Sequence, residues 1–219
     1  MPSRRQWLKA TVAALGGIGA SRRGRALAAP GELALPADTP TRTYDFGAGG
    51  IAGWTIVSGQ WTVEELADSP SGRKALVQRA TCNEFNVIVA PGRFRDLDVS
   101  VMFKPISGRE DASGGIVFRF DGGKYYVVRA NALEGNFRLY HYDRGRRQIA
   151  TAAVKAPALG RWHPVRLLAV GGHMQAWLDG ALLLDHHDSR LGVGQVGLWT
   201  KADSVTAFDG LGVRGKQED

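Results

Sequence analysis

The stretch GGIVFRFDGGKYYVVRAN, residues 114–131, decides the fold. Two runs of β-forming residues flank the turn sequence DGGK at 121–124, and this pattern predicts an antiparallel hairpin. Residues that oppose each other in such a pair share one face of the sheet. With Arg119 placed opposite Tyr125, one face is apolar and core-like: Ile116, Phe118, Phe120, Tyr126, Val128 and Ala130. The second face is mixed: Val117, Arg119, Tyr125, Val127, Arg129 and Asn131.

Similar β-type runs continue on both sides of this hairpin, separated by turns rich in Gly, Asp and Pro. After residue 28, no stretch has a convincing helical period of 3.6 residues. We expect strands at 61–66, 75–80, 86–89, 98–104, 115–120, 125–131, 137–142, 149–154, 165–170, 173–178, 196–200 and 206–213. Many short strands with regular turns predict an all-β fold, either a sandwich or a barrel of antiparallel strands.

The first 28 residues have the layout of an export signal. The sequence SRRQWLK at 3–9 resembles a twin-arginine motif, a short apolar run follows at 10–20, and ALA at 26–28 fits a cleavage site. We therefore expect the twin-arginine export machinery to deliver a periplasmic or secreted chain that begins at Ala29. Two alternatives remain open, namely a basic N-terminus that binds lipid or nucleic acid and an uncleaved anchor. After the signal we place a linker at 29–40, one β domain at 41–215 and a tail at 216–219.

The net charge supports this division of the chain. The full sequence has 28 Lys and Arg against 21 Asp and Glu, a formal charge of +7. Six of the basic residues and none of the acidic ones lie in residues 1–28, so the expected mature chain carries only +1. Such a balance argues against a nucleic-acid partner. No apolar run reaches the roughly 20 residues of a membrane-spanning helix, so no stable membrane span is expected.

The segment NALEGNFRLYHY at 131–142 extends the mixed face of the hairpin. Arg138 and Tyr140 alternate on one side of the expected strand, and Glu134 lies in the loop before it. Aromatic rings stack on the C–H faces of sugars, while arginine and amide groups hydrogen-bond hydroxyls or carboxylates. The pattern predicts a carbohydrate site with these substrate-binding residues: Arg119, Tyr125, Arg129, Asn131, Arg138 and Tyr140. A solvated outer face, with each arginine paired to a neighbouring carboxylate, fits the same residues.

Other combinations of reactive residues give weaker signals. His186, His187 and Asp188 include possible metal ligands, but no second cluster lies at a recognisable spacing, so we assign them to polar surface. Cys82 is a lone thiol, expected to be buried and inert. The GxSxG motif of serine hydrolases does not occur in the sequence. We predict neither a bound metal nor a cofactor.

The segments at 114–140 and 196–213 resemble the 3-keto-disaccharide hydrolase domain family of the concanavalin A-like jelly-roll superfamily. The likeness covers about residues 44–213 and includes Trp54, Trp61, Trp162 and Asp209. It implies two curved antiparallel sheets, with sugars bound on the concave one. Members of the hydrolase type start the strand after Gly-Ile-x-Phe-Arg with Tyr-Glu, where this chain has Tyr125-Tyr126.

Two functions follow from the resemblance and the mixed face. The first is an exported hydrolase or lyase acting on 3-keto-glycosides or related glycans, in which Glu134 is the catalytic acid or base. The alternative is a lectin-like, non-catalytic module that binds a glycan on the same face. Glycoside hydrolysis normally needs two carboxylates, so the missing Glu favours the alternative. A sandwich that only contacts other proteins is a third possibility, because a fold does not determine a function.

Overall fold

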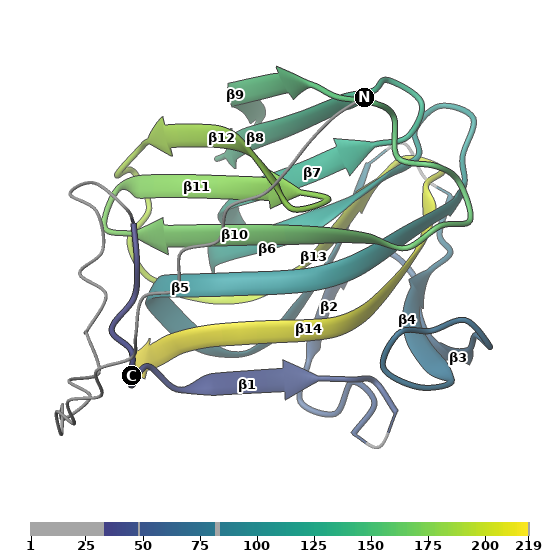
Figure 1. Ribbon diagram of the computed structural model, residues 1–219, viewed down its shortest axis with the longest axis horizontal. Helices are drawn as coiled ribbons and strands as arrows, with labels where there is room; N and C mark the ends of the chain where they lie inside the picture. The colour runs from purple at the N-terminus through teal and green to yellow at the C-terminus, as the bar shows by residue number, and fades with distance from the viewer. Residues whose placement is uncertain (1–32, 48, 82–83, 219) are drawn as a thin grey trace, which may run out of the picture. The chain divides into compact units, whose positions relative to one another are not determined.

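The computed structural model describes residues 33–47, 49–81 and 84–218. These residues form strands joined by turns and contain no helix, which confirms the predicted all-β class (Figure 1). Within them, nothing helical is long and apolar enough to cross a membrane. The strands are β1 (Thr41–Tyr44), β2 (Thr55–Ser58), β3 (Trp61–Glu65), β4 (Lys74–Gln78), β5 (Phe85–Ser107), β6 (Ser113–Asp121), β7 (Lys124–Asn131), β8 (Asn136–Tyr142), β9 (Arg146–Ala153), β10 (His163–Val170), β11 (His173–Leu178), β12 (Ala181–His187), β13 (Gly194–Lys201) and β14 (Val205–Glu218).

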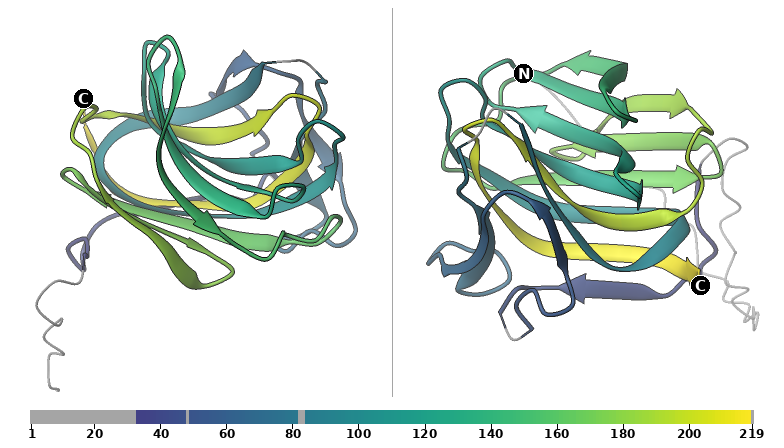
Figure 2. Two further views of the ribbon diagram at one scale, coloured as in Figure 1. Left: turned by 90° about the horizontal axis from the view of Figure 1, so that it is seen from above. Right: turned by 180° about the vertical axis from the view of Figure 1, so that it is seen from behind.

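The long strand β5 joins two layers of antiparallel strands. Its residues 85–94 pair with β13, and its residues 97–103 pair with β10. The first layer runs β2-β5-β13-β6-β7-β8-β9, and the second runs β12-β11-β10-β5-β14, followed by β1 and β4 as further neighbours of β14. Both layers are curved (Figure 2). The chain therefore has the expected jelly-roll sandwich of two curved antiparallel sheets.

Alternate residues of each strand point between the layers and form the main core. Val99, Val101 and Phe103 of β5 contribute, as the period of two in that segment predicts. They meet a second set from other strands: Ile116, Phe118, Tyr126, Val128, Leu167, Met174, Leu198 and Phe208. Full burial of one such large side chain stabilises the fold by roughly 1.5–3 kcal/mol. The core therefore holds the two layers together. The outer face of each layer does not contribute to this core.

The central hairpin has the predicted register up to Phe118, which lies opposite Tyr126. Beyond that point a β-bulge shifts the pairing, and Asp121 lies opposite Lys124 across a tight Gly-Gly turn. The predicted pairing of Arg119 with Tyr125 is therefore wrong. Arg119 has a positive φ of 51°, so its side chain leaves the mixed face. Phe120, predicted in the core, instead packs on the outer face of the first layer.

The structure moves two of the expected boundaries. Strand β14 continues to Glu218, so residues 216–218 belong to the sheet and not to a tail. Part of the expected linker also packs on this strand, because Gly215 N donates to Pro40 O at 2.9 Å and the Arg214 side chain donates to the Pro36 carbonyl. The signal at 1–28 and the lone Cys82 lie outside the described residues.

Candidate functional site

Strands β7 and β8 bring most of the predicted site residues onto the outer face of the first layer. Four cross-strand pairs share this face: Tyr125 with Tyr142, Val127 with Tyr140, Arg129 with Arg138, and Asn131 with Asn136. Glu134 lies in the loop between the two strands. We call Arg129, Glu134, Asn136, Arg138 and Tyr140 the polar cluster. Sequence reasoning missed Asn136, although it alternates with Arg138 and Tyr140 along β8.

Glu134 is held through one of its two carboxylate oxygens. Oε2 accepts hydrogen bonds from Asn136 Nδ2 at 2.7 Å, from Arg138 Nη1 at 3.2 Å and from Arg129 Nη2 at 3.3 Å. In the described part of the chain, Oε1 has no hydrogen-bond donor. The Glu134 side chain is 46% exposed, so Oε1 is available to a ligand.

The surroundings of Glu134 favour its charged form. The hydrogen bond from Asn136 lowers the pKa of the Glu134 carboxyl from the ordinary 4.5, and the charges of Arg129 and Arg138 lower it further. Partial burial opposes these effects without reversing them. Glu134 is therefore ionised at neutral pH and acts as a hydrogen-bond acceptor.

Arg129 is the buried member of the polar cluster and contacts three of its other residues. Its side chain is only 2% exposed and donates to Tyr140 Oη at 3.1 Å and to the Oδ1 atom of Asn136. A buried guanidinium is costly unless it is paired with a carboxylate and hydrogen-bonded, and the polar cluster supplies both. Its Nε atom has no partner among the described residues. Arg129 thus fixes the ring and amide groups that border the exposed edge of Glu134.

Asn131 positions the loop that carries Glu134. Its Oδ1 atom accepts hydrogen bonds from the backbone N of Leu133 at 2.7 Å and of Glu134 at 3.1 Å. Its Nδ2 atom donates to Asp111, which also forms an ion pair with Lys201 at 3.4 Å. Asn131 is fully buried. Its amide is therefore engaged in shaping the loop, whereas the sequence analysis expected it to contact the sugar.

An aromatic hollow adjoins the polar cluster on the same face. We use this name for the space of about 330 Å³ bordered by several aromatic side chains, among them Phe85, Phe120, Tyr125 and Tyr142. The Tyr125 and Tyr142 rings stack with centroids 4.9 Å apart, and Phe120 stacks on Tyr125 at 5.8 Å. Burial raises the pKa of Tyr125 well above its usual range, so this phenol stays neutral. Phe85, Phe120 and Tyr142 are half-buried and offer ring surface to a ligand.

Arg146 connects the aromatic hollow with the polar cluster. Its guanidinium carbon lies 4.7 Å from the centre of the Tyr140 ring and 5.5 Å from that of Phe85. Because strand β9 starts at Arg146, this contact comes from a third strand beside β7 and β8. Cation–π contacts of this kind hold a guanidinium over the faces of aromatic rings. The two parts of the face therefore form one continuous surface.

Arg119 does not take part in this surface. Its Nε and Nη2 atoms donate to the Arg95 carbonyl at 3.2 and 2.9 Å, while other donors reach the carbonyls of Leu191 at 2.9 Å and Gly171 at 2.5 Å. Burial lowers the pKa of the Arg119 guanidinium. The expectation that Arg119 lies with the other site residues is wrong, because the bulge turns it toward these loops.

Comparisons with known proteins find similarity in sequence to one enzyme and in fold to solved structures. No protein-family model matches the chain. The chain is 26% identical over 151 residues to a levanase of Bacillus subtilis, which covers 68% of this chain and 21% of the levanase. The chain thus spans about a fifth of that enzyme's length.

Two solved structures have the same fold. The carbohydrate-binding module CBM66 of Bacillus subtilis is 22% identical and superimposes with a TM-score of 0.64 over 74% of this chain and 96% of that module. Domain 4 of AbnA, a GH43 extracellular arabinanase of Geobacillus stearothermophilus solved with arabinotriose, is 15% identical with a TM-score of 0.55, over 81% and 92% of the two chains. These similarities show that the chain shares the jelly-roll fold of these structures.

Proposed function

We propose that this chain is a non-catalytic carbohydrate-binding module and that its ligand is a fructan such as levan. The observation that carries the proposal is the free Oε1 atom of Glu134, which lies beside the half-buried Arg138 on the face that also carries the aromatic hollow. An ionised carboxylate accepts hydroxyl protons, a guanidinium donates to hydroxyl oxygens, and aromatic rings cover C–H faces. The levanase similarity suggests the fructan among neutral polysaccharides.

The protonation state of Glu134 supports binding over hydrolysis. A glycosidase needs a carboxylic acid with a raised pKa together with a second carboxylate. The pKa of Glu134 is lowered, and Glu134 is the sole carboxylate of the polar cluster as defined above. The neighbouring Asp111 is 2% exposed and engaged with Asn131 and Lys201. Glu134 is therefore not suited to protonate a leaving sugar, and Asp111 is too deeply buried to contact one.

A 3-keto-glycoside hydrolase or lyase is the second candidate. The feature in its favour is the same free oxygen, because an ionised carboxylate with an open oxygen can act as a base. In that case Glu134 would remove a proton from the substrate. The ion pairs with Arg129 and Arg138 would keep the Glu134 carboxylate ionised and in place. A sugar-release assay with a 3-keto-glycoside decides between the two candidates.

We also propose that the protein is periplasmic or secreted and reaches that compartment through the twin-arginine machinery. Support comes from the SRRQWLK sequence at 3–9 and the small residues at 26–28. An exported location agrees with a polysaccharide ligand, because polymers of this size do not enter the cytoplasm intact.

The binding proposal is tested by calorimetry with levan and, in parallel, with a linear arabinan. We expect saturable binding of levan without release of sugar, and at least a tenfold loss of affinity for Arg138→Met. Arg166→Met is the matched control, because Arg166 pairs with Asp98 on the other layer. Absence of saturable levan binding, or equal affinities of the two variants, would overturn the proposal. Release of sugar would favour the enzyme.

A further inference from the structure

Strands β11 and β12 carry a group of side chains that the binding proposal does not use. His173 lies directly opposite His187, and Gln175 lies opposite Asp185. Met174, Ala176 and Leu178 of β11 point into the core, so His173 and Gln175 occupy the outer face of the second layer. In the sequence His187 has no second group of ligands at a recognisable spacing, but the cross-strand pairing brings His173 and Asp185 next to it.

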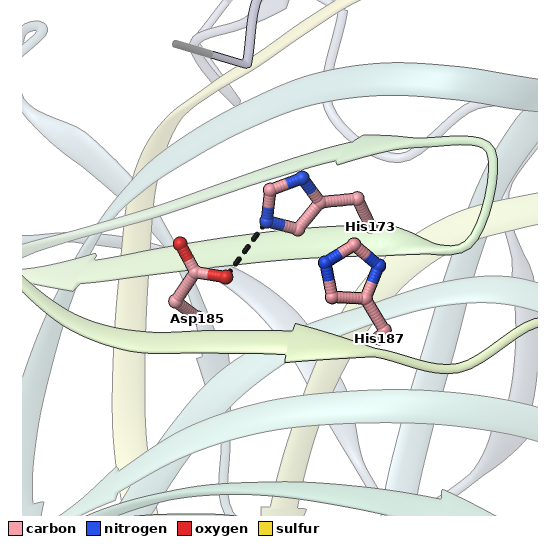
Figure 3. Close-up of side chains that lie close together, drawn as sticks. All are labelled: His173, Asp185 and His187. Atoms are coloured by element: carbon pink, nitrogen blue, oxygen red, sulfur yellow. Dashed lines mark hydrogen bonds and ion pairs between the residues drawn. The ribbon is translucent and has the colours of Figure 1, made fainter. Parts of the chain in front are cut away.

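The three side chains of His173, Asp185 and His187 turn toward one another (Figure 3). Nε2 of His173 donates to Oδ1 of Asp185 at 2.7 Å. The two imidazole rings stack with centroids 4.1 Å apart. One nitrogen or oxygen atom from each of the three residues lies within 4.8 Å of the other two. Donor atoms around a tetrahedral ion at bond lengths near 2.1 Å are about 3.4 Å apart, so modest rotations of the side chains would close the set.

We propose that His173, Asp185 and His187 form a binding site for a divalent transition-metal ion, with Zn²⁺ as the reference ion. Two imidazoles and a carboxylate match the ligands of zinc sites that keep a fourth position for water. Imidazole donors also separate this site chemically from calcium and magnesium sites, which use oxygen ligands. Asp185 is 51% exposed and His173 is 23% exposed, so an ion reaches the donors from solvent.

A neighbouring residue orients the carboxylate of this site. Gln175 Nε2 donates to Oδ2 of Asp185 at 2.8 Å and thereby directs Oδ1 toward His173. Partners of this kind around a metal ligand fix its geometry and typically change affinity by about 10–100-fold when removed. All four residues stand on two paired strands, so the backbone holds their spacing.

The bound ion would fasten the edge of the second layer. β12 is the last strand in that layer, and edge strands are held by a partner on one side only. An ion that joins His173 of β11 to Asp185 and His187 of β12 would cross the one pairing that holds this edge strand in the layer. The site lies on the second layer, whereas the polar cluster lies on the first, so the two sites would act independently.

The test is a titration of the untagged, chelator-treated protein with Zn²⁺, followed by calorimetry. We expect one ion per chain and at least a tenfold weaker affinity for His187→Ala. His186→Ala is the matched control, because His186 neighbours the site in sequence but lies on the opposite face of β12 and should change affinity less than twofold. No saturable binding by the wild type, or the same affinity in both variants, would overturn the proposal.

A second measurement keeps the test valid if a variant fails to fold. In the wild type, nitrogen NMR of the five histidine rings should show Zn²⁺-dependent shifts for His173 and His187. The rings of His141 and His163, which lie on other strands, should not change. Shifts confined to those other rings would contradict the site.

Discussion

Glu134 shows how a single residue prepares the face for a ligand. Three donors converge on Oε2, so the carboxylate is fixed in place before a ligand arrives and Oε1 faces outward. Replacement by Gln keeps the shape but removes the charge. Because hydrogen bonds to charged groups are worth about 1.5–3 kcal/mol, we expect Glu134→Gln to weaken levan binding about 10–100-fold. Calorimetry measures the loss, and unchanged affinity would remove Glu134 from the site.

The lowered pKa of Glu134 predicts how binding depends on pH. Because the pKa of Glu134 in the folded protein is below the ordinary 4.5, its carboxylate stays ionised when the pH falls to 4.5. It stops accepting hydrogen bonds only when the pH falls through the lower pKa of the folded protein. Levan affinity should therefore be constant from about pH 8 down to about pH 5 and then decrease with a midpoint below the ordinary value of 4.5. A midpoint near pH 6 would instead indicate a protonated, acid-type Glu134 and would favour the enzymatic alternative.

Arg119 is expected to affect stability and not binding. Its guanidinium donates to the backbone carbonyls of Arg95, Gly171 and Leu191, and it is 1% exposed. A buried acceptor without a partner costs about 1–3 kcal/mol, so Arg119→Met should lower the free energy of unfolding by several kcal/mol. Urea denaturation measures this change. A loss of levan affinity at unchanged stability would restore Arg119 as a ligand residue.

At the scale of single elements, the alternation of apolar and polar residues predicted the strands that have one buried apolar face. The alternation in β7 and β8 placed Arg129 and Arg138 on the correct sides, because a period of two fixes the face of each residue. The bulge at Arg119 could not be predicted, since nothing in its side chain signals a positive φ. The edge strands β1, β2 and β12 were not predicted, because exposed strands such as β2 lack a buried apolar face.

Gly115 determines how closely β6 approaches β7. A Cβ atom added there would lie 2.1 Å from the carbonyl oxygen of Val128 and 2.6 Å from the Cβ atom of Arg129. Gly115→Ala should therefore push the strands apart, lower stability by about 1–3 kcal/mol and weaken levan binding through Arg129. Gly145→Ala is the control, because its Cβ would meet nothing within 4 Å. Equal urea midpoints for the two variants would contradict this packing.

At the scale of the whole molecule, the site combines strands that are far apart in sequence. Residues of the polar cluster lie within eleven positions of one another, so their pattern was visible along the chain. Phe85 of β5 joins Tyr142 through the order β5-β13-β6-β7-β8, which requires the complete topology of the layer. Phe120 reaches the aromatic hollow only because of the bulge. The hollow was therefore missed.

The export signal makes a prediction for the whole chain. N-terminal sequencing of the exported protein should give Ala29 as the first residue, and replacing Arg4 and Arg5 by Lys should block export. A start at Met1, or undiminished export of the double variant, would contradict the twin-arginine assignment.

The most direct test of the central claim is an NMR titration of the protein with a short levan oligosaccharide. The claim is that the outer face of β7 and β8 binds the sugar. We predict shifts in the Nε–H signals of Arg129 and Arg138 and in the side-chain amide of Asn136, with the Nε–H signal of Arg166 on the second layer unchanged. Shifts at Arg166 without shifts at Arg129 and Arg138, or no shifts at saturating oligosaccharide, would contradict the account.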